Sequence, residues 1–375
     1  MRVGLLAAVV LTASPLAAQE SQAPWRLSYF PYLTVSPNDG LMGIARAIWF
    51  RQAGWDERYT LANSVALEAG YSTRDAWLAR ATWANPAFAE GWRMMAHAEV
   101  GHEPRFGDPD DSIERDRAYA WVDVTRRIRG PFHLALRGGY RHEKLQDDDQ
   151  EGATEREQGD ATARLALLVD LRDREFEVNR GVLLEGGMIV GSAGRPRFDG
   201  TTVRGYHALY AHLRGWYNPL PYLRLTGRFA VREDVEGWRL AAQHEFPGWE
   251  GDFTVVGGHR SHRGLGIGQL TTSDALQYRA GGAMLAGAEA RFDVLNVGEM
   301  GALTVFAFVD GGRVLRNTGI FCGIGPCDAF EREDDWHWGG GGGIALRVLR
   351  AATLTISAAG GDGETRWYVG SGWSW

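Results

Sequence analysis

Residues 257–268 read Gly257-Gly-His-Arg-Ser-His-Arg-Gly-Leu-Gly-Ile-Gly268, a basic stretch that is rich in glycine. The segments on either side of it alternate between polar and apolar residues, a pattern that is typical of β-strands and not of helices. The stretch lies in the interval 234–276, which is long for a connection between two strands. A long connection between strands, with no helical pattern on either side, indicates an all-β fold.

The composition favours a β-barrel in a membrane. The chain has 50 Gly, 15 Trp and 12 Tyr in 375 residues. No stretch approaches the roughly 20 consecutive apolar residues that a transmembrane helix needs. Barrel strands alternate apolar residues toward lipid with polar residues toward the lumen, so each strand gives a weak signal and the series gives a strong one. The net charge of −7 argues against a nucleic-acid partner.

Sixteen segments show this alternation, an even number, as bacterial outer-membrane barrels have. The long intervals 103–114, 144–158, 192–202, 234–276 and 315–336 all follow odd-numbered segments, and short ones such as 129–130 and 349–350 follow even-numbered segments. Because such barrels have short periplasmic turns and long external loops, this parity predicts that both termini lie in the periplasm. We expect an all-β fold, a 16-stranded antiparallel transmembrane β-barrel with its sixth external loop folded into the lumen. The predicted strands are 26–34, 41–50, 59–71, 76–85, 89–102, 115–127, 131–143, 159–171, 179–191, 203–216, 221–233, 277–294, 302–314, 337–348, 351–360 and 366–375.

The two ends of the chain carry targeting signals. Residues 1–18 have the form of a secretory signal peptide, with a short apolar run over 3–11 and Ala17-Ala18 before the cleavage point. We expect residues 19–375 to form a single barrel domain, located in the bacterial outer membrane. The chain ends on Trp375, and a terminal aromatic strand resembles the signal by which outer-membrane barrels are recognised for insertion.

Two cysteines, Cys322 and Cys327, lie close together in one of the long intervals. A secreted chain meets an oxidising compartment, so we predict a disulfide that closes a loop tip. A zinc site needs four ligands, and partners are lacking nearby. His259 and His262 form a His-x-x-His pair without a third ligand. We therefore expect no metal and no cofactor.

Arg263 is the residue of the long connection that we expect to be bound in the lumen. A cation there needs partners, because desolvating an unpaired charge is costly. Phe306, Phe308 and Asp310 share one face of their predicted strand. Phe308 offers a ring face and Asp310 a two-oxygen acceptor, and Gly312 with its glycine neighbour allows close backbone approach. The alternative is that Arg263 is a solvated loop residue.

A five-glycine run, 339–343, lies in a predicted strand. It lacks the Lys-Ser/Thr of a phosphate-binding loop, so we predict that it bends the wall or clears room for the loop.

Four motifs occur in a fixed order in the last third of the chain. They are Gly257-Gly258, Arg263-Gly264-Leu265, Glu289-Ala-Arg291 and Phe308-Val-Asp310-Gly-Gly312. The set resembles the barrel of the outer-membrane assembly-factor superfamily, which includes BamA, TamA, two-partner secretion transporters and the bacterial surface antigen barrels. Asp170-Leu-Arg-Asp173, followed by Asn179-Arg-Gly181, resembles another stretch of that family. Leu265 departs from the family's aromatic residue, and we expect no POTRA domain here, since strand alternation begins at about Trp25.

The resemblance implies a monomeric, non-enzymatic barrel that inserts or translocates proteins or another client at the outer membrane. Its implied partners are outer-membrane lipid, client outer-membrane or secreted proteins and a separate periplasmic partner. The family mechanism implies a weak seam between the first and last strands, and Gly370 and Gly372 are consistent with poor pairing there. Two alternatives stay open. A passive pore fits because sixteen strands leave a channel when unplugged, and the acidic loops also suit a surface adhesion or structural barrel.

Overall fold

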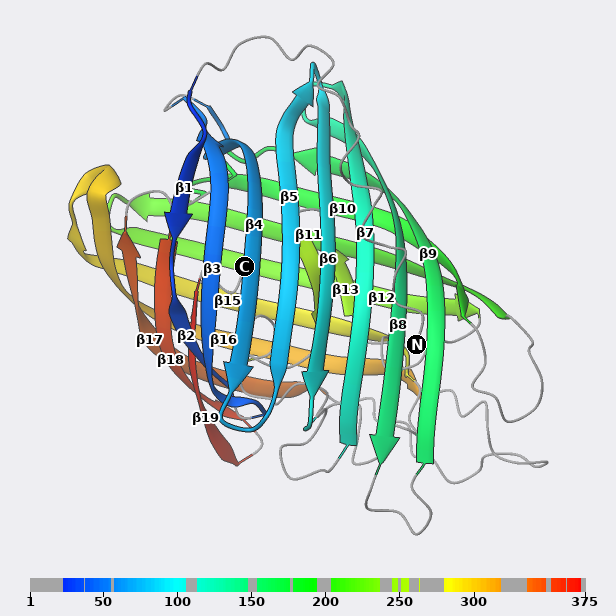
Figure 1. The fold of residues 1–375 in the computed structure, drawn as a ribbon. Coiled ribbons are helices and arrows are strands. Elements are labelled where there is room, and N and C mark those ends of the chain that lie inside the picture. The colour runs from blue at the N-terminus through cyan, green and yellow to red at the C-terminus, as the bar shows by residue number, and fades with distance from the viewer. Residues whose placement is uncertain are drawn as a thin grey trace.

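The structure of the chain is a computed structural model (Figure 1). Its described part contains no helix long and apolar enough to cross a membrane. The structure describes residues 23–371 except 37, 55–56, 106–112, 148–153, 176–177, 194–203, 237–244, 249–250, 256–262, 264–279, 318–335, 349–351 and 362.

Antiparallel strands form one closed sheet, in which most strands pair with the strand before and the strand after them in the chain. In Figure 1, strands β3–β9 form the near wall and cross β11, β12, β15 and β16 of the far wall. The strands are β1 (Arg26–Tyr29), β2 (Tyr32–Ser36), β3 (Gly40–Gln52), β4 (Leu61–Ser72), β5 (Trp77–Ala89), β6 (Trp92–Glu103), β7 (Ile113–Arg129), β8 (Phe132–Asp147), β9 (Thr154–Asp170), β10 (Gly181–Ala193), β11 (Arg204–Leu220), β12 (Leu223–Glu236), β15 (Ala280–Asn296), β16 (Gly301–Asn317), β17 (His337–Val348), β18 (Ala352–Gly361) and β19 (Glu364–Ser371).

The first wall strand is interrupted by Pro31 and consists of β1 and β2. Both parts pair with β3 in one continuous register, from Arg26↔Phe50 to Ser36↔Gly40. Proline has no N–H to donate to the ladder, which explains the interruption. The sheet has 17 strand segments, so counting β1 and β2 as one strand gives the sixteen that the sequence predicts. The fold prediction of a 16-stranded antiparallel barrel is confirmed.

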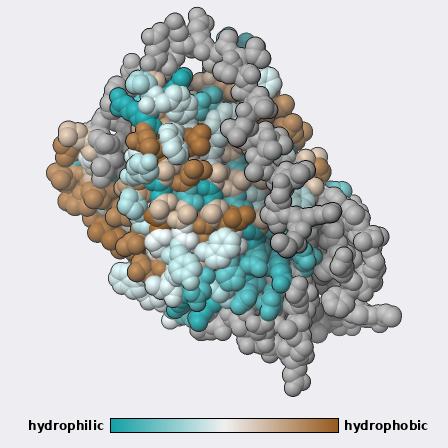
Figure 2. All heavy atoms as spheres, in the orientation of Figure 1, coloured by the Kyte–Doolittle hydropathy of each residue, from teal (hydrophilic) through white to brown (hydrophobic). Residues whose placement is uncertain are grey.

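The inner and outer faces of the wall differ in polarity. On β16, Val305 and Val309 are exposed, whereas Phe306, Phe308 and Asp310 are buried. The exposed apolar face suits lipid, and the buried face, which carries the charged residues, lines the lumen. Figure 2 shows hydrophobic side chains gathered at the left, where the yellow connection between β15 and β16 lies in Figure 1.

The two longest connections, residues 237–279 and 318–336, lie at the same end of the barrel, as the sequence predicts. We call one end the short-turn end; its connections are residues 53–60, 90–91, 130–131, 171–180, 221–222, 297–300 and 349–351. A 3-10 helix, Gly298–Met300, forms part of one of these turns. The opposite, long-loop end carries the extended intervals 237–279 and 318–336.

The predicted strands include none in the long connection after β12, whereas the structure has a short hairpin there. Strands β13 (Glu245–Gly248) and β14 (Gly251–Val255) pair as a separate hairpin, with Glu245 opposite Val255. The elements are only 4 and 5 residues long, too short for alternation to stand out. Strand β13 lies next to β11 and β12.

Alternating charges fill the inner face from β3 to β8. Each arginine of this ion-pair chain lies beside a glutamate of the same or an adjacent strand, so the charges largely compensate one another. The pairs are Arg46–Glu68 (3.5 Å), Glu68–Arg80, Arg80–Glu99 (3.9 Å), Glu99–Arg117 (2.6 Å), Arg117–Glu103 (3.1 Å), Glu103–Arg115 (2.6 Å) and Arg115–Glu143 (3.7 Å).

Candidate functional site

Arg263, between β14 and β15, is among the most buried side chains of the described chain, at 1% exposure. Asp310 of β16 holds it through three hydrogen bonds. The Arg263 backbone N–H donates to Oδ2 at 3.1 Å, Nε donates to the same oxygen at 2.7 Å, and Nη2 donates to Oδ1 at 3.2 Å. This is the two-pronged geometry in which arginine binds a carboxylate most strongly.

Glu289 and Phe308 complete the grip on the guanidinium. Nη1 of Arg263 donates to Oε2 of Glu289 at 2.5 Å, and the guanidinium carbon lies 3.3 Å from the centre of the Phe308 ring. A planar fork can stack on a ring and bind two carboxylates at once, whereas a lysine ammonium cannot do both. The sequence reasoning assigned Asp310 and Phe308 to Arg263 but did not assign Glu289 as a direct partner.

Strand register brings these partners together. Glu289 of β15 lies directly opposite Phe308 of β16, and Asp310 lies opposite Gly287. Because Gly287 has no side chain, space is left beside the Asp310 carboxylate. Gly312 lies two residues beyond Asp310 on the same face of β16, where it is buried.

Two further arginines share the same carboxylates. Nε of Arg291 donates to Oε1 of Glu289 at 2.5 Å, and Nη2 of Arg228 donates to Oδ1 of Asp310 at 3.5 Å. Removing one member of such a buried ionic group leaves the other charges uncompensated, which typically costs about 3–5 kcal/mol.

Tyr368 of β19 also contacts Arg263, and the sequence gave no indication of it. Its hydroxyl donates a hydrogen bond of 3.0 Å to the carbonyl oxygen of Arg263. The alternation of the last strand correctly puts Tyr368 on the face opposite Trp367, and the two are 2% and 63% exposed. The alternation along the strand therefore predicts that the Tyr368 side chain points into the lumen, but it does not predict that Arg263 is its partner.

The five-glycine run lies in β17, beside the phenylalanines of β16. Gly343 is opposite Phe306 and Gly341 is opposite Phe308. A Cβ on Gly343 would lie 2.7 Å from the Phe306 ring and 2.2 Å from the carbonyl oxygen of Ile356. These glycines therefore give the rings and the neighbouring strand room to pack closely.

The barrel closes where β19 meets β2. Among the described residues, Val369↔Val35 is the registered pair that joins these two strands. By contrast, β19 pairs with β18 over its whole length, from Glu364↔Gly361 to Ser371↔Leu354. The closing contact is therefore short in the described part of the wall.

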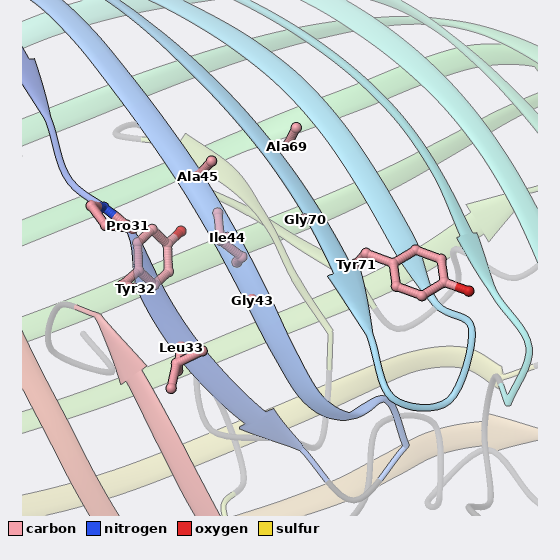
Figure 3. A pocket seen from close by; sticks show the side chains of 9 residues that line it. All are labelled: Pro31, Tyr32, Leu33, Gly43, Ile44, Ala45, Ala69, Gly70 and Tyr71. Carbon is pink, nitrogen blue, oxygen red and sulfur yellow. The ribbon is translucent and has the colours of Figure 1, made fainter.

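An apolar hollow of about 590 Å³ lies beside this closing contact (Figure 3). Its wall includes Leu33 and Tyr71, which are 54% and 60% exposed and belong to the outer face. Gly43, Ala45 and Ala69 supply its shallow floor. In a membrane this hollow faces acyl chains.

A second cluster, at the short-turn end, is built on the Asp-x-Arg-Asp motif. Residues 171–180, which we call the cross-brace, connect β9 and β10 and contact the connection between β3 and β4. Arg58 Nη2 lies 3.0 Å from Oδ2 of Asp170 and donates to the carbonyl of Arg172 at 2.9 Å, and the Glu175 N–H donates to the carbonyl of Arg58 at 2.8 Å.

The cross-brace spans part of the barrel mouth. Strands β4 and β9 are five positions apart in the sheet, which corresponds to about 24 Å along the wall. Contacts near 3 Å between their connections therefore require one connection to reach across the opening. Arg93 of β6 adds a 2.7 Å ion pair to Glu175.

Several predicted site residues lie outside the described residues. They are the signal peptide 1–18, His259, His262, Gly264, Cys322, Cys327, Gly372 and Trp375.

A closed antiparallel wall with an apolar outer face and a charged inner face defines a transmembrane β-barrel of the outer-membrane type. Residues 60–351 match the family model described as the Omp85 superfamily domain. The chain belongs to the Omp85 superfamily, an outer-membrane family, which confirms the resemblance drawn from the motifs.

Solved structures support this fold. BamA from Haemophilus ducreyi lacking POTRA domains 1-3 is similar with a TM-score of 0.57 and 13% identity, over 92% of this chain and 70% of that one. CdiB from Escherichia coli is similar with a TM-score of 0.56 and 12% identity, over 93% and 67%. At these identities the likeness shows the fold alone. No curated protein sequence matches the chain.

Proposed function

We propose that this barrel inserts or translocates client proteins at the outer membrane, without enzymatic activity, and that its long sixth connection is docked inside the lumen through Arg263. The observation that carries the proposal is the buried Arg263 guanidinium, bound to Asp310, Glu289 and Phe308 on the inner wall. Membership of a family of outer-membrane insertion and translocation barrels supports the proposal that the clients are proteins.

The geometry supports a link between the docked connection and the closing strand. Arg263 contacts β15 and β16 through its side chain and β19 through its carbonyl oxygen. Strand β19 is the one that meets β2 in the short closing contact. A barrel that handles clients at its wall needs a contact that can open, and this is the least extensively paired part of the described wall.

The proposal extends to the orientation of the barrel in the membrane and to its partner proteins. We propose that the short-turn end faces the periplasm, that residues 1–18 are removed on export and that residues 19–375 form a monomeric barrel. We further propose that a separate periplasmic partner delivers the client, that Cys322 and Cys327 form a disulfide and that Trp375 serves in recognition for insertion.

The test is a deletion strain complemented with the wild-type chain, with Arg263→Ala or with Arg174→Ala as a matched control. Arg174 lies on the cross-brace, away from the Arg263 site, with a side chain that is 37% exposed. We expect the deletion and Arg263→Ala to deplete particular proteins from the outer membrane, and the wild type and Arg174→Ala to restore them.

Purification in mild detergent supplies the second measurement. We expect the wild-type barrel to bring a client or periplasmic partner with it. A normal outer-membrane protein profile in the deletion strain, together with no co-purifying protein, would argue for the passive pore or the adhesion barrel instead.

A further inference from the structure

Two tryptophan–arginine pairs lie on the outer face of the wall at the short-turn end, which is the upper rim in Figure 1. Trp25, just before β1, lies beside Arg51 of β3, whose guanidinium carbon is 5.1 Å from the centre of the Trp25 ring. Trp92 of β6 lies directly opposite Arg126 of β7, whose guanidinium carbon is 4.9 Å from the Trp92 ring. The attraction between a guanidinium and an indole face holds each cation beside its ring.

The alternation of the strands places both pairs toward lipid. The two tryptophans are 45% and 41% exposed. Arg126 shares a strand face with Ile128, which is exposed, and Arg51 shares a strand face with Trp49, which is also exposed. These arginines therefore lie on the outside of the barrel, away from the charged lumen.

Neither outer arginine is ion-paired with a carboxylate in the described part of the chain. Nη1 of Arg126 donates a 2.8 Å hydrogen bond to the carbonyl oxygen of Glu90, which is a neutral acceptor. Nε of Arg51 is buried and has no hydrogen-bond partner among the described residues. By contrast, Arg263, which lies over a ring on the inner wall, is also bound to two carboxylates. The outer pairs thus carry positive charge that the surrounding wall does not cancel.

Further aromatic residues mark the same rim between the two pairs. Trp49 and Phe88 are 39% and 40% exposed, and the Phe88 ring lies edge-on to Trp83 at a centroid distance of 6.3 Å. Exposed tryptophans on a membrane barrel gather at the membrane–water interface, where the lipid headgroups lie. An arginine at this depth keeps its stem on the apolar surface and extends its charged end to the headgroups.

We propose that each pair, Trp25 with Arg51 and Trp92 with Arg126, binds the phosphate of an anionic glycerophospholipid. The arginine fork matches the oxygens of a phosphate, and the negative headgroup supplies the charge that the wall lacks. Strands β3 and β7 are four positions apart in the sheet, which is about 19 Å along the wall, so the two pairs bind separate lipids. The orientation proposed above then makes the periplasmic leaflet the source of these lipids.

The experiment counts the phospholipids that the folded barrel retains in mild detergent, by native mass spectrometry. Phosphatidylglycerol is the probe, and zwitterionic phosphatidylcholine with the same acyl chains is the comparison. The variants are Arg51→Gln, Arg126→Gln and the double variant. Arg46→Gln is the control, because Arg46 is luminal and lies 3.5 Å from Glu68 in the ion-pair chain. Heat-modifiable gel mobility establishes that each variant is folded.

We expect the wild type to retain phosphatidylglycerol in preference to phosphatidylcholine. Each single variant should bind phosphatidylglycerol about fivefold more weakly at the altered pair, as for loss of one basic residue near an anionic membrane surface. The double variant should show no preference, and Arg46→Gln should behave as the wild type. The proposal is overturned by equal retention of both lipids, by an unchanged preference in the double variant, by an equal loss in Arg46→Gln, or by displacement of the lipid by an equal concentration of inorganic phosphate.

Trp92→Leu separates the pairing from charge alone. It removes the ring beside the Arg126 guanidinium and keeps an apolar side chain toward lipid. We expect weaker retention of phosphatidylglycerol at this pair, and full wild-type retention would contradict the role given to the tryptophan. None of these measurements depends on which end of the barrel faces the periplasm or on whether the barrel handles client proteins.

Discussion

The hydroxyl of Tyr368 donates a 3.0 Å hydrogen bond to the carbonyl oxygen of Arg263, 105 positions earlier in the chain. Tyr368 is in β19, the strand that pairs with β2 where the barrel closes. A buried residue of the long connection therefore contacts three wall strands, β15, β16 and β19. The position of this connection and the position of the closing strand are physically linked.

Tyr368→Phe should weaken this link while preserving the packing of the ring. Loss of one hydrogen bond of this kind typically costs about 1 kcal/mol, and the Arg263 carbonyl is left in a buried setting. We expect a lower temperature for the heat-modifiable gel shift and faster protease cleavage within 256–279. Tyr71→Phe is the control, since its hydroxyl bonds to Asp75 on the exposed surface. Equal behaviour of the two variants would contradict the link.

Arg263→Ala should destabilise the barrel by about 3–5 kcal/mol, because Asp310 and Glu289 would remain buried without their shared cation. Arg263→Lys should recover only part of the loss, since an ammonium cannot bind both carboxylates and stack on Phe308. Urea unfolding followed by tryptophan fluorescence measures both changes. Recovery of full wild-type stability by Arg263→Lys would show that charge alone matters and that the fork geometry does not.

Gly343→Ala should impair packing between β17 and its neighbours. The new Cβ would lie 2.2 Å from the Ile356 carbonyl oxygen and 2.7 Å from the Phe306 ring, and such overpacking typically costs about 1–3 kcal/mol. We expect a lower yield of folded barrel in detergent refolding. At Gly360 on β18 the nearest atoms to a new Cβ are 3.9 Å away, so Gly360→Ala should refold normally. Equal yields would mean that the wall adjusts freely at Gly343.

Breaking the cross-brace should open the short-turn mouth. In Arg93→Glu the carboxylate would face Glu175, and in Glu175→Arg the guanidinium would face Arg93, where a 2.7 Å ion pair now exists. Either single change should raise single-channel conductance in planar bilayers, because like charges repel at this separation. The double change restores opposite charges and should return the conductance toward the wild-type value. If the double variant conducts as much as the single variants, the ion pair between Arg93 and Glu175 does not control how open the mouth is.

The sequence predicted what depends on local periodicity. Leu354 and Ile356 alternate with Thr353 and Ser357, and the structure exposes the first two and buries the last two. Period two is a property of a single strand, so it is readable without knowing the neighbours. The same reasoning predicted that the longest connections share one end of the barrel, and the strand ends agree with this.

The contacts of the site depend on register and on segments far apart in the sequence, and these carry no local signal. Tyr368 follows the same alternation as any inner-face residue, and nothing near it indicates Arg263. Arg58 likewise lies in an unremarkable turn, although it holds the cross-brace from 114 positions away. Asp310 and Phe308 were predicted as partners because a phenylalanine and a carboxylate of equal parity suit a guanidinium, which is a chemical argument and not a periodic one.

We expect the ion-pair chain from Arg46 to Glu143 to stiffen the side of the barrel wall on which it lies. Strands β3 to β8 are cross-linked to one another by charge, whereas β17 presents a run of glycines between its neighbours. We expect a lateral strain on the wall to be absorbed mainly at the glycine run of β17 and at the short contact between β19 and β2. Raising the ionic strength should soften the stiff side where its charges reach water, and so make the barrel deform more evenly.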